Sequence, residues 1–259
     1  MSTFNQLCVV CSSPAMGYNY GNLIYLDNNR QHLFLNCYFN GDPSIRDTTK
    51  SLIFIEKRKD FQETYQNWSF MSCLTALDFL RKLGFMKKLK PADQGSILEN
   101  AFKNFALFSI GQASFESRKG CLEFPNGLQL PQNLEAASQA FRNRMQCRLI
   151  GRMIELNVSK EEFLLLSVIL LCNPGAPNLS ADGATLISTQ QKYYTAALFH
   201  LCSLTQGKSG SSRFSELLFL LPVIVATIED LTAHCLLLKI YSRSNWKPKK
   251  IFIPSEQEE

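Results

Sequence analysis

The sequence predicts an all-α protein that contains one short β-hairpin. Three observations support this prediction. Apolar residues recur at the three- and four-residue spacing of helices through most of residues 62–242. Prolines and capping residues divide that stretch into segments of ordinary helix length. Only residues 122–127 combine apolar alternation with a turn signal, so we expect a single hairpin there.

The first predicted helix covers residues 62–88, and its apolar side chains recur once per turn: Phe70, Leu74, Leu77, Leu80 and Leu83. Pro91 ends this helix, because the residue before a proline disfavours the α conformation. Pro91 also suits the first turn of the next helix, where Asp93 adds favourable negative charge. This second helix extends to about Ala113 and is apolar on more than one side, so we expect it at the centre of the fold.

The rest of the body alternates turns and helices. Leu122-Glu123-Phe124 followed by Pro125-Asn126-Gly127 gives the hairpin. Ser159 and Glu162 have the spacing of a helix capping box, and Pro222 would kink the helix that contains it. Further helices are predicted at residues 133–156, 159–172, 182–205 and 212–242.

Composition and charge narrow the class of protein. The chain has 259 residues, which suits one large domain with a small appendage. Its net charge of +5 permits contact with nucleic acid but does not argue for it, since Lys and Arg are scattered. Nine Cys without a secretory signal predict reduced thiols in the nucleus or cytoplasm. The apolar runs are shorter than the ~18 residues of a membrane span, so no membrane partner is expected.

The order of several motifs resembles the ligand-binding domain of nuclear hormone receptors over about residues 64–242. Asp93-Gln94 follows Leu80–Met86 and comes well before Arg213-Phe214, and the turn at residues 124–127 and Cys172-Asn173-Pro174 lie at matching positions between them. The resemblance implies a three-layer antiparallel helical sandwich around an apolar cavity, with the domain at residues 61–242. It also implies a transcription regulator that responds to a small lipophilic ligand, such as a steroid or lipid, or is an orphan.

The first sixty residues resemble a degenerate zinc-finger DNA-binding domain of the same family, in the style of its supplementary nematode branch. Cys8-x-x-Cys11 followed by the run at residues 15–21 is similar to the start of the first finger, and Cys37-Tyr38-Phe39 to the start of the second. The family uses eight Cys for two tetrahedral zinc sites. Family spacing places other residues at the remaining five positions: Tyr25, Asn28, Pro43, Ile53 and Glu56.

Cys8, Cys11 and Cys37 are therefore an incomplete zinc set that we predict does not bind metal, and no cofactor is expected. Small zinc modules fold on metal-binding energy, so residues 1–60 are predicted to be a remnant that lacks the family's fold. The recognition helix is also missing, and a net charge of about +1 over these residues makes direct DNA binding doubtful. Two alternatives stay open: a chance match of the Cys pair, or a mis-spliced gene model.

The resemblance implies positions for a ligand pocket. Its predicted lining is apolar, with Gln112 and Arg118 as polar anchors for a hydroxyl or carboxylate. The alternative is that the apolar side chains fill the core completely. The predicted pocket residues are Phe70, Cys73, Leu74, Leu77, Phe105, Phe108, Gln112, Arg118, Phe124 and Met153.

The resemblance also implies two protein contacts. A coregulator groove would use the cations of Arg81 and Lys82. At a second position where the family often has a basic residue, this chain has Glu99, which reverses the charge. The alternative for Arg81 is a solvated surface charge. The tail at residues 243–259 contains two prolines and lacks a recognisable activation helix. A dimer contact on the last helix would use its far end: His234, Leu237, Leu238 and Tyr241.

Two functional hypotheses follow from these features. The first is a receptor-family regulator that acts in the nucleus without direct DNA binding, by dimerising with another nuclear receptor or with itself and by contacting coregulator proteins. The second is a helical lipid-binding carrier or sensor with no transcriptional role. Catalysis is not expected, because the three His show no metal spacing and no nucleophile motif is present.

Overall fold

A computed structural model describes residues 19–59, 61, 63–131, 137–241 and 249–253, and this part of the chain is mostly helical, as predicted. The α-helices are α1 (Asn19–Asn36), α2 (Tyr65–Arg81), α3 (Pro91–Glu116), α4 (Gln139–Leu156), α5 (Lys160–Leu171), α6 (Ala181–Gln206), α7 (Gly210–Leu218) and α8 (Leu220–Tyr241). Short 3-10 helices lie at η1 (Asp47–Thr49), η2 (Met86–Lys88), η3 (Gly207–Ser209) and η4 (Lys250–Phe252).

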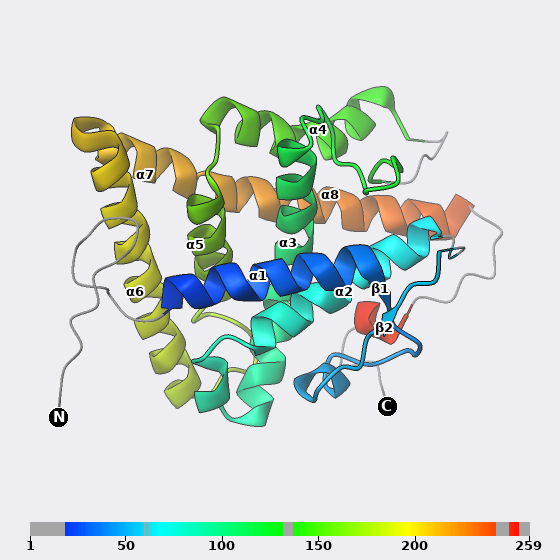
Figure 1. Cartoon of the computed structure of the whole chain (residues 1–259), viewed down its shortest axis with the longest axis horizontal. Helices are drawn as coiled ribbons and strands as arrows, with labels where there is room; N and C mark the ends of the chain where they lie inside the picture. Colours follow the sequence, from blue (N-terminus) through cyan, green and yellow to red (C-terminus); the bar gives the residue numbers. More distant parts are fainter. Residues whose placement is uncertain (1–18, 60, 62, 132–136, 242–248, 254–259) are drawn as a thin grey trace.

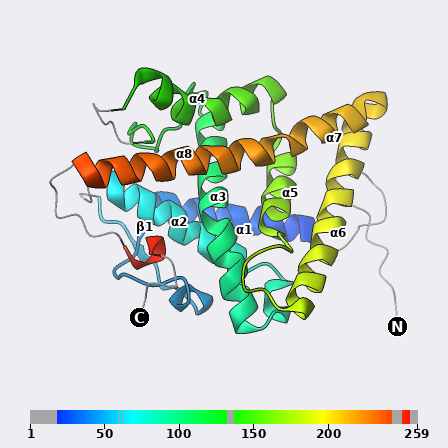
Figure 2. The same cartoon turned by 180° about the vertical axis from the view of Figure 1, so that it is seen from behind.

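Helix α3 runs through the middle of the molecule. Figure 1 shows α1 and α2 crossing in front of it, and Figure 2 shows α8 crossing on the opposite side, with α4 near one end. Helix α5 packs beside α3 and against α6. Ile97, Phe102, Phe105 and Phe108 of α3 are each at most 1% exposed, so the helix is buried on several sides. The prediction that this helix is central is confirmed.

The helix predicted at residues 212–242 is two helices, α7 and α8, with a break at Phe219. Pro222 explains the break, because it lacks the N–H that a continuous helix would donate to the carbonyl of Leu218. The capping box at the start of α5 is confirmed: Glu162 N–H donates to Ser159 Oγ at 3.2 Å, and Ser159 N–H donates to a Glu162 carboxylate oxygen at 2.9 Å.

The strands differ from the prediction. The expected hairpin is reduced to one isolated bridge between Glu123 and Gln129, closed by the turn in which Gly127 N–H donates to the Phe124 carbonyl at 2.9 Å. A two-stranded antiparallel sheet lies elsewhere, where β1 (Cys37–Tyr38) pairs with β2 (Ile55–Glu56). No strand is predicted from the sequence at either of these two-residue segments.

Helix α1 belongs to the same core as the rest of the molecule. Leu23, Leu26 and Phe34 are 1%, 6% and 7% exposed and lie in the hydrophobic cluster that also contains α2 and α3. Helix α1 thus packs in this core, and the predicted remnant at residues 1–60, with its boundary at residue 60, stays a prediction. Burial of these apolar side chains stabilises the folded state of α1 without a zinc site.

The predicted zinc ligands are not assembled in the described part of the chain. Cys8 and Cys11 lie outside the described residues. Cys37 is a buried free thiol whose pKa is raised mainly by burial. Within the described ranges, His, Cys, Asp and Glu side chains form no group of three or more that could hold a metal ion.

The Asp93-Gln94 motif has a structural role. The Asp93 carboxylate accepts hydrogen bonds from Ser180 N–H at 2.8 Å and Ser180 Oγ at 2.7 Å, which joins the first turn of α3 to the N-cap of α6. These bonds hold the pKa of Asp93 below its usual value. Gly183 is needed alongside, because a Cβ there would lie 2.8 Å from the carboxylate. Gln94 Nε2 donates to the Leu89 carbonyl at 3.0 Å and closes the preceding turn.

Leu23→Ala should lower the free energy of unfolding of the whole domain by about 2–5 kcal/mol, because it opens a cavity in the shared core. The measurement is urea unfolding followed by circular dichroism, which should show one transition. Leu35→Ala is the control, since Leu35 lies on the same helix but is 47% exposed. A Leu23→Ala protein as stable as the wild type would contradict the placement of α1 in the core.

Asp93→Asn should lower the free energy of unfolding at pH 7 by about 1–3 kcal/mol, because charge-assisted bonds to Ser180 are lost. The folded-state pKa of Asp93 is depressed, so its contribution is present above the unfolded pKa of about 3.9 and is lost as pH falls through the folded pKa. The difference in free energy of unfolding between the wild type and Asp93→Asn should therefore shrink below about pH 4.

Urea titrations of both proteins across pH 7 to 3 measure this difference. Asp182→Asn provides a matched control, because Asp182 pairs with Lys90 at the same helix start with its side chain 86% exposed. A difference that stays constant with pH would exclude the carboxylate as the stabilising group.

Candidate ligand-binding site

A partly open cavity of about 310 Å³ lies between α1, α3 and the loop at residues 123–125. Its apolar wall includes Phe34, Ile110 and Phe124, and small side chains of α3 widen it. The full lining is Arg30, Gln31, Phe34, Leu35, Ser72, Ala106, Ser109, Ile110, Gln112, Ala113, Ser114, Glu116, Ser117, Lys119, Glu123, Phe124 and Pro125.

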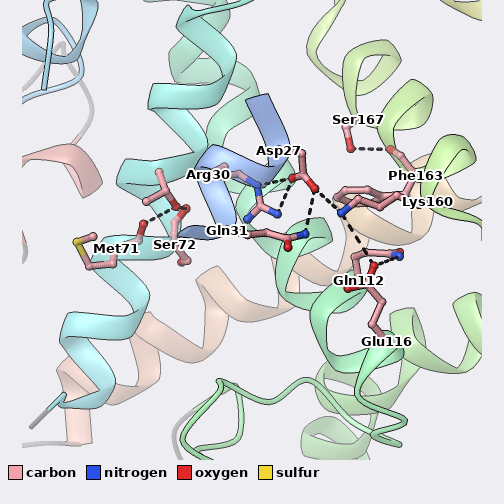
Figure 3. Close-up of polar contacts among 11 residues, drawn as sticks. Asp27, Arg30, Gln31, Met71, Ser72, Gln112, Glu116, Lys160, Phe163 and Ser167 are labelled. Atoms are coloured by element: carbon pink, nitrogen blue, oxygen red, sulfur yellow. Dashed lines mark hydrogen bonds and ion pairs between the residues drawn. The ribbon is translucent and has the colours of Figure 1, made fainter. Parts of the chain in front are cut away.

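A buried ion network forms one side of this cavity. The Asp27 carboxylate, 0% exposed, accepts hydrogen bonds from Arg30 Nε at 2.8 Å and Gln31 Nε2 at 3.0 Å. Lys160 Nζ, at the start of α5, also pairs with Asp27. Figure 3 shows these side chains converging from α1 and α5. The network therefore fixes α1 against the centre of the fold.

The network continues to the cavity wall on α3. Lys160 Nζ lies 4.0 Å from a Glu116 carboxylate oxygen, and Gln112 Nε2 donates to Glu116 at 3.0 Å (Figure 3). The Arg30 guanidinium lies over the Phe105 ring, 5.7 Å from its centroid. Lys119 and Glu123 form a further ion pair of 2.7 Å at the rim.

Two residues that line the cavity each have a buried polar atom without a hydrogen-bond partner among the described residues. The atoms are Ser109 Oγ and Gln112 Oε1, in residues 5% and 3% exposed. An unsatisfied buried polar group costs about 1–3 kcal/mol. Both residues lie on α3 three positions apart, so they share one face of the helix.

Of the predicted pocket residues, Gln112 and Phe124 line this cavity. Six others are buried in the hydrophobic core, each at most 8% exposed: Phe70, Cys73, Leu74, Leu77, Phe105 and Phe108. Met153 is also buried there, whereas Arg118 is exposed with a φ of 55°. Their assignment to a ligand pocket stays a prediction.

The sequence reading missed the contribution of α1 to this site. Arg30, Gln31 and Phe34 were assigned to a zinc-finger remnant, although Asp27 and Arg30 have the spacing of a helical ion pair. Ser109 was missed because a serine inside an apolar helix carries no periodic signal. Burial raises the pKa of the Cys73 thiol to about 12, so this core thiol is not a reactive group.

The predicted coregulator cations are both held by one buried carboxylate. Arg81 donates to Asp78 at 3.1 Å and 2.6 Å, and Lys82 at 2.5 Å. Asp78 itself is 1% exposed. The described part of the tail docks elsewhere: Lys249 Nζ lies over the Phe70 ring near the other end of α2, 5.1 Å from its centroid.

The predicted dimer residues whose side chains are described differ in burial. His234 is 0% exposed and its ring lies 6.4 Å from that of Phe141 in α4, so His234 faces the interior, and its part in a dimer contact stays a prediction. Leu237 and Leu238 are half-buried, and the side chain of Tyr241 lies outside the described residues. Leu236, between His234 and Leu237 in the sequence, is 55% exposed.

Comparison with known proteins defines the family. Residues 54–241 match the family described as the ligand-binding domain of nuclear hormone receptor. Three Caenorhabditis elegans proteins are among the relatives: nuclear hormone receptor family members nhr-167 (33% identical, 81% of this chain and 63% of the relative), nhr-27 (33%, 83% and 63%) and nhr-9 (32%, 83% and 65%). The chain belongs to the nuclear hormone receptor family.

Two further findings bear on its class. Nuclear receptors are non-enzymatic, which confirms the expectation that the chain is not an enzyme. No helix in the described ranges is long and apolar enough to cross a membrane. The chain spans less than two thirds of the length of the relatives named above, at 63–65%.

Asp27→Asn should lower the free energy of unfolding by about 3–5 kcal/mol, because it leaves the buried Arg30 cation without its carboxylate. Chemical denaturation measures the effect. Glu155→Gln is the control, since Glu155 pairs with Arg152 on the surface with its side chain 60% exposed, and it should change stability by less than about 0.5 kcal/mol. Equal stability of the two variants would show that the Asp27 network does not hold α1.

Proposed function

We propose that the chain is a nuclear hormone receptor family regulator of transcription that acts in the nucleus by pairing with a second receptor ligand-binding domain, its own copy or that of another receptor. Membership of the family supports the regulatory role. Within the family fold, the proposed architecture is a three-layer helical sandwich, in which α3 and α5 form the middle. The proposal does not depend on a bound ligand.

An exposed apolar face on α8 carries this proposal. Val225 and Leu236 are 40% and 55% exposed and lie eleven residues apart, which is close to three helical turns, so they project from the same side. Phe219, at the junction with α7, is 66% exposed. Glu229 and Thr232 lie exposed between Val225 and Leu236 on this side of α8, so the proposed contact is apolar at both ends and polar between them. We therefore place the pairing contact on Val225 and Leu236, in place of the buried His234.

The absence of direct DNA binding is the second part of the proposal. Tyr25 and Asn28, at two positions where the family places zinc ligands, lie within helix α1. The family's recognition helix would begin at residues 25–32. In this chain Asp27 and Arg30 of that stretch are buried in the core, where they form a hydrogen-bonded ion pair. A segment that packs in the domain core is not available to enter a DNA groove, which favours regulation through a partner.

The basic end of α2 is the proposed coregulator contact. Arg81 and Lys82 have side chains 15% and 35% exposed, so Lys82 is the more accessible cation. Residues 249–253 contact Phe70 and Asp42. Phe70 lies eleven residues from Arg81, about 16 Å along the helix axis. This segment therefore leaves the Arg81 end of α2 open to a partner helix.

Leu236→Glu should raise the dissociation constant of the pair at least about tenfold, because it buries a charge in an apolar contact. Sedimentation equilibrium of the full chain, alone and mixed with the ligand-binding domain of a receptor relative, measures the pairing. Ile154→Glu is the matched control, since Ile154 is 50% exposed on α4.

A wild-type chain that stays monomeric in both conditions would contradict the proposal. If that monomer also carried a lipid-sized mass in native mass spectrometry, the carrier function would replace it.

A further inference from the structure

We propose that Cys121 and Cys147 form a reversible oxidation site, at which hydrogen peroxide converts the two thiols into a disulfide that links the loop after α3 to α4. Cys121 lies in the loop at residues 117–131, and Cys147 lies on α4. This inference goes beyond the proposed pairing and uses neither Val225 nor Leu236 of α8. It rests on the closeness of the two residues, their access to solvent and the burial of other thiols.

A backbone hydrogen bond brings the two cysteines together. Leu122 N–H donates to the Gln146 carbonyl at 2.9 Å, and Cys121 and Cys147 are the residues next to these two groups in the chain. Standard backbone bond lengths then keep their Cα atoms within about 8 Å of each other. Disulfides usually join Cα atoms about 4.4–6.8 Å apart, so the bond needs at most a small backbone movement.

The loop holds Cys121 in this position. Leu122, the next residue, is 0% exposed. Ser114 Oγ accepts a hydrogen bond from Glu123 N–H at 3.0 Å and donates to the Glu123 carbonyl at 3.2 Å. On the other side of Cys121, Gly120 is exposed, and an added Cβ there would meet no atom within 4 Å. The chain is therefore anchored after Cys121 and has room before it for the movement that a disulfide needs.

The Cys147 sulfur also acts on Cys121 electrostatically. The pKa of the Cys121 thiol is raised first by burial and second by Cys147, whose effect is larger than that of Glu123 in the same loop. Coulomb interactions weaken with distance, so this order agrees with a short separation of the two thiols. A raised pKa keeps Cys121 protonated at pH 7, and the more exposed Cys147 therefore meets the oxidant first.

Access to solvent distinguishes this pair from the thiols of the core. Cys147 is exposed and Cys121 is half-buried. Cys73 and Cys172 are buried, and burial raises the pKa of each to about 12, so they contain little of the reactive thiolate at pH 7. In the described ranges, Cys235 on α8 is the other exposed thiol. Oxidation should therefore select the loop and α4 over the core.

The reaction balances with hydrogen peroxide as the oxidant. The Cys147 thiolate attacks one peroxide oxygen, the O–O bond breaks, and the departing hydroxide takes up a proton and leaves as water, so that Cys147 becomes a sulfenic acid. The Cys121 sulfur then attacks the Cys147 sulfur, the S–O bond breaks, and the released hydroxide takes the Cys121 proton and leaves as a second water. A dithiol reductant restores both thiols by thiol–disulfide exchange.

The disulfide acts as a reversible restraint on the loop. Thiols are kept reduced in the nucleus, so the bond forms only when oxidant rises, and exposed disulfides are the readily reduced ones. In the oxidised chain, the loop that contributes Glu123, Phe124 and Pro125 to the cavity lining is attached covalently to α4. The bond also restrains the unfolded chain between Cys121 and Cys147, which favours the folded state.

Peptide mapping of the full chain after peroxide treatment tests this inference. Remaining thiols are blocked with iodoacetamide, and trypsin is applied without reductant. Trypsin cleaves after Lys and Arg, so the two thiols fall on separate peptides, residues 120–142 and 145–148. We expect these peptides joined, with two hydrogen atoms fewer than their sum, and separated by dithiothreitol. A Cys147 that is oxidised to a sulfinic acid or joined to a second chain, without the joined peptide, would overturn the proposal.

Substitutions then assign the role of each thiol. Cys121→Ser should lose the joined peptide and accumulate the Cys147 sulfenic acid, which dimedone traps, whereas Cys147→Ser should lose both products. Cys235→Ser is the matched control, because it removes an exposed thiol on another helix and should leave the amount of joined peptide unchanged. Joined peptide that forms equally well in urea would refute selection of the pair by the fold.

Urea unfolding followed by circular dichroism gives a second readout. The oxidised wild type should unfold at a higher urea concentration than the reduced protein, dithiothreitol should remove this shift, and Cys121→Ser should not show it. An unchanged midpoint in fully linked protein would overturn the restraint of the loop. Both readouts concern a bond within one chain, so a failed oxidation and a failed pairing through α8 are separate results.

Discussion

Helix α3 must be covered on every side, and the rest of the structure depends on this constraint. Phe102, Leu107 and Phe108 are at most 2% exposed although they project in different directions around the helix. A helix that is apolar all round is stable only inside a protein. Helices α2 and α5 cover two of its sides, α4 and α8 cover another, and α1 lies against the cavity side, where Arg30 contacts Phe105.

The coverage by α1 is polar as well as apolar, and this combination shapes the cavity. Leu23 and Phe34 bury apolar area, whereas Asp27 binds Arg30 on its own helix and Lys160 on α5. A buried ion cluster adds little net stability compared with an apolar core, but it permits only one relative position of the helices. The Asp27 network thus determines how far α1 stands from Ser109 and Gln112.

The sequence predicted the helices well because their pattern is local. Helical spacing and prolines located α2 through α6 and the central position of α3, and the order of motifs around Asp93, which joins α3 to α6 in the structure, indicated the family. Helix α1 was not predicted, because Cys8, Cys11 and Cys37 on either side of it carry the pattern of a zinc module. His234 could not be placed from periodicity, since α8 is apolar on more sides than one contact needs. Gln112 and Phe124 were predicted for the site, whereas Ser109 depends on a rotamer that no sequence pattern reports.

The distribution of side-chain size around α3 explains why the cavity lies beside α1 and not in the middle of the core. Toward α5, aromatic rings pack closely: the centroids of Phe108 and Phe163 are 4.7 Å apart. Toward α1, the same helix presents Ala106, Ser109 and Ala113, whose spacing of three and four residues aligns small side chains along one stripe. One helix therefore both fills the core and leaves a space beside it, and the two residues with unsatisfied atoms line that space. Enlarging the stripe would remove the cavity without disturbing the aromatic core, which is why the two faces can be altered independently.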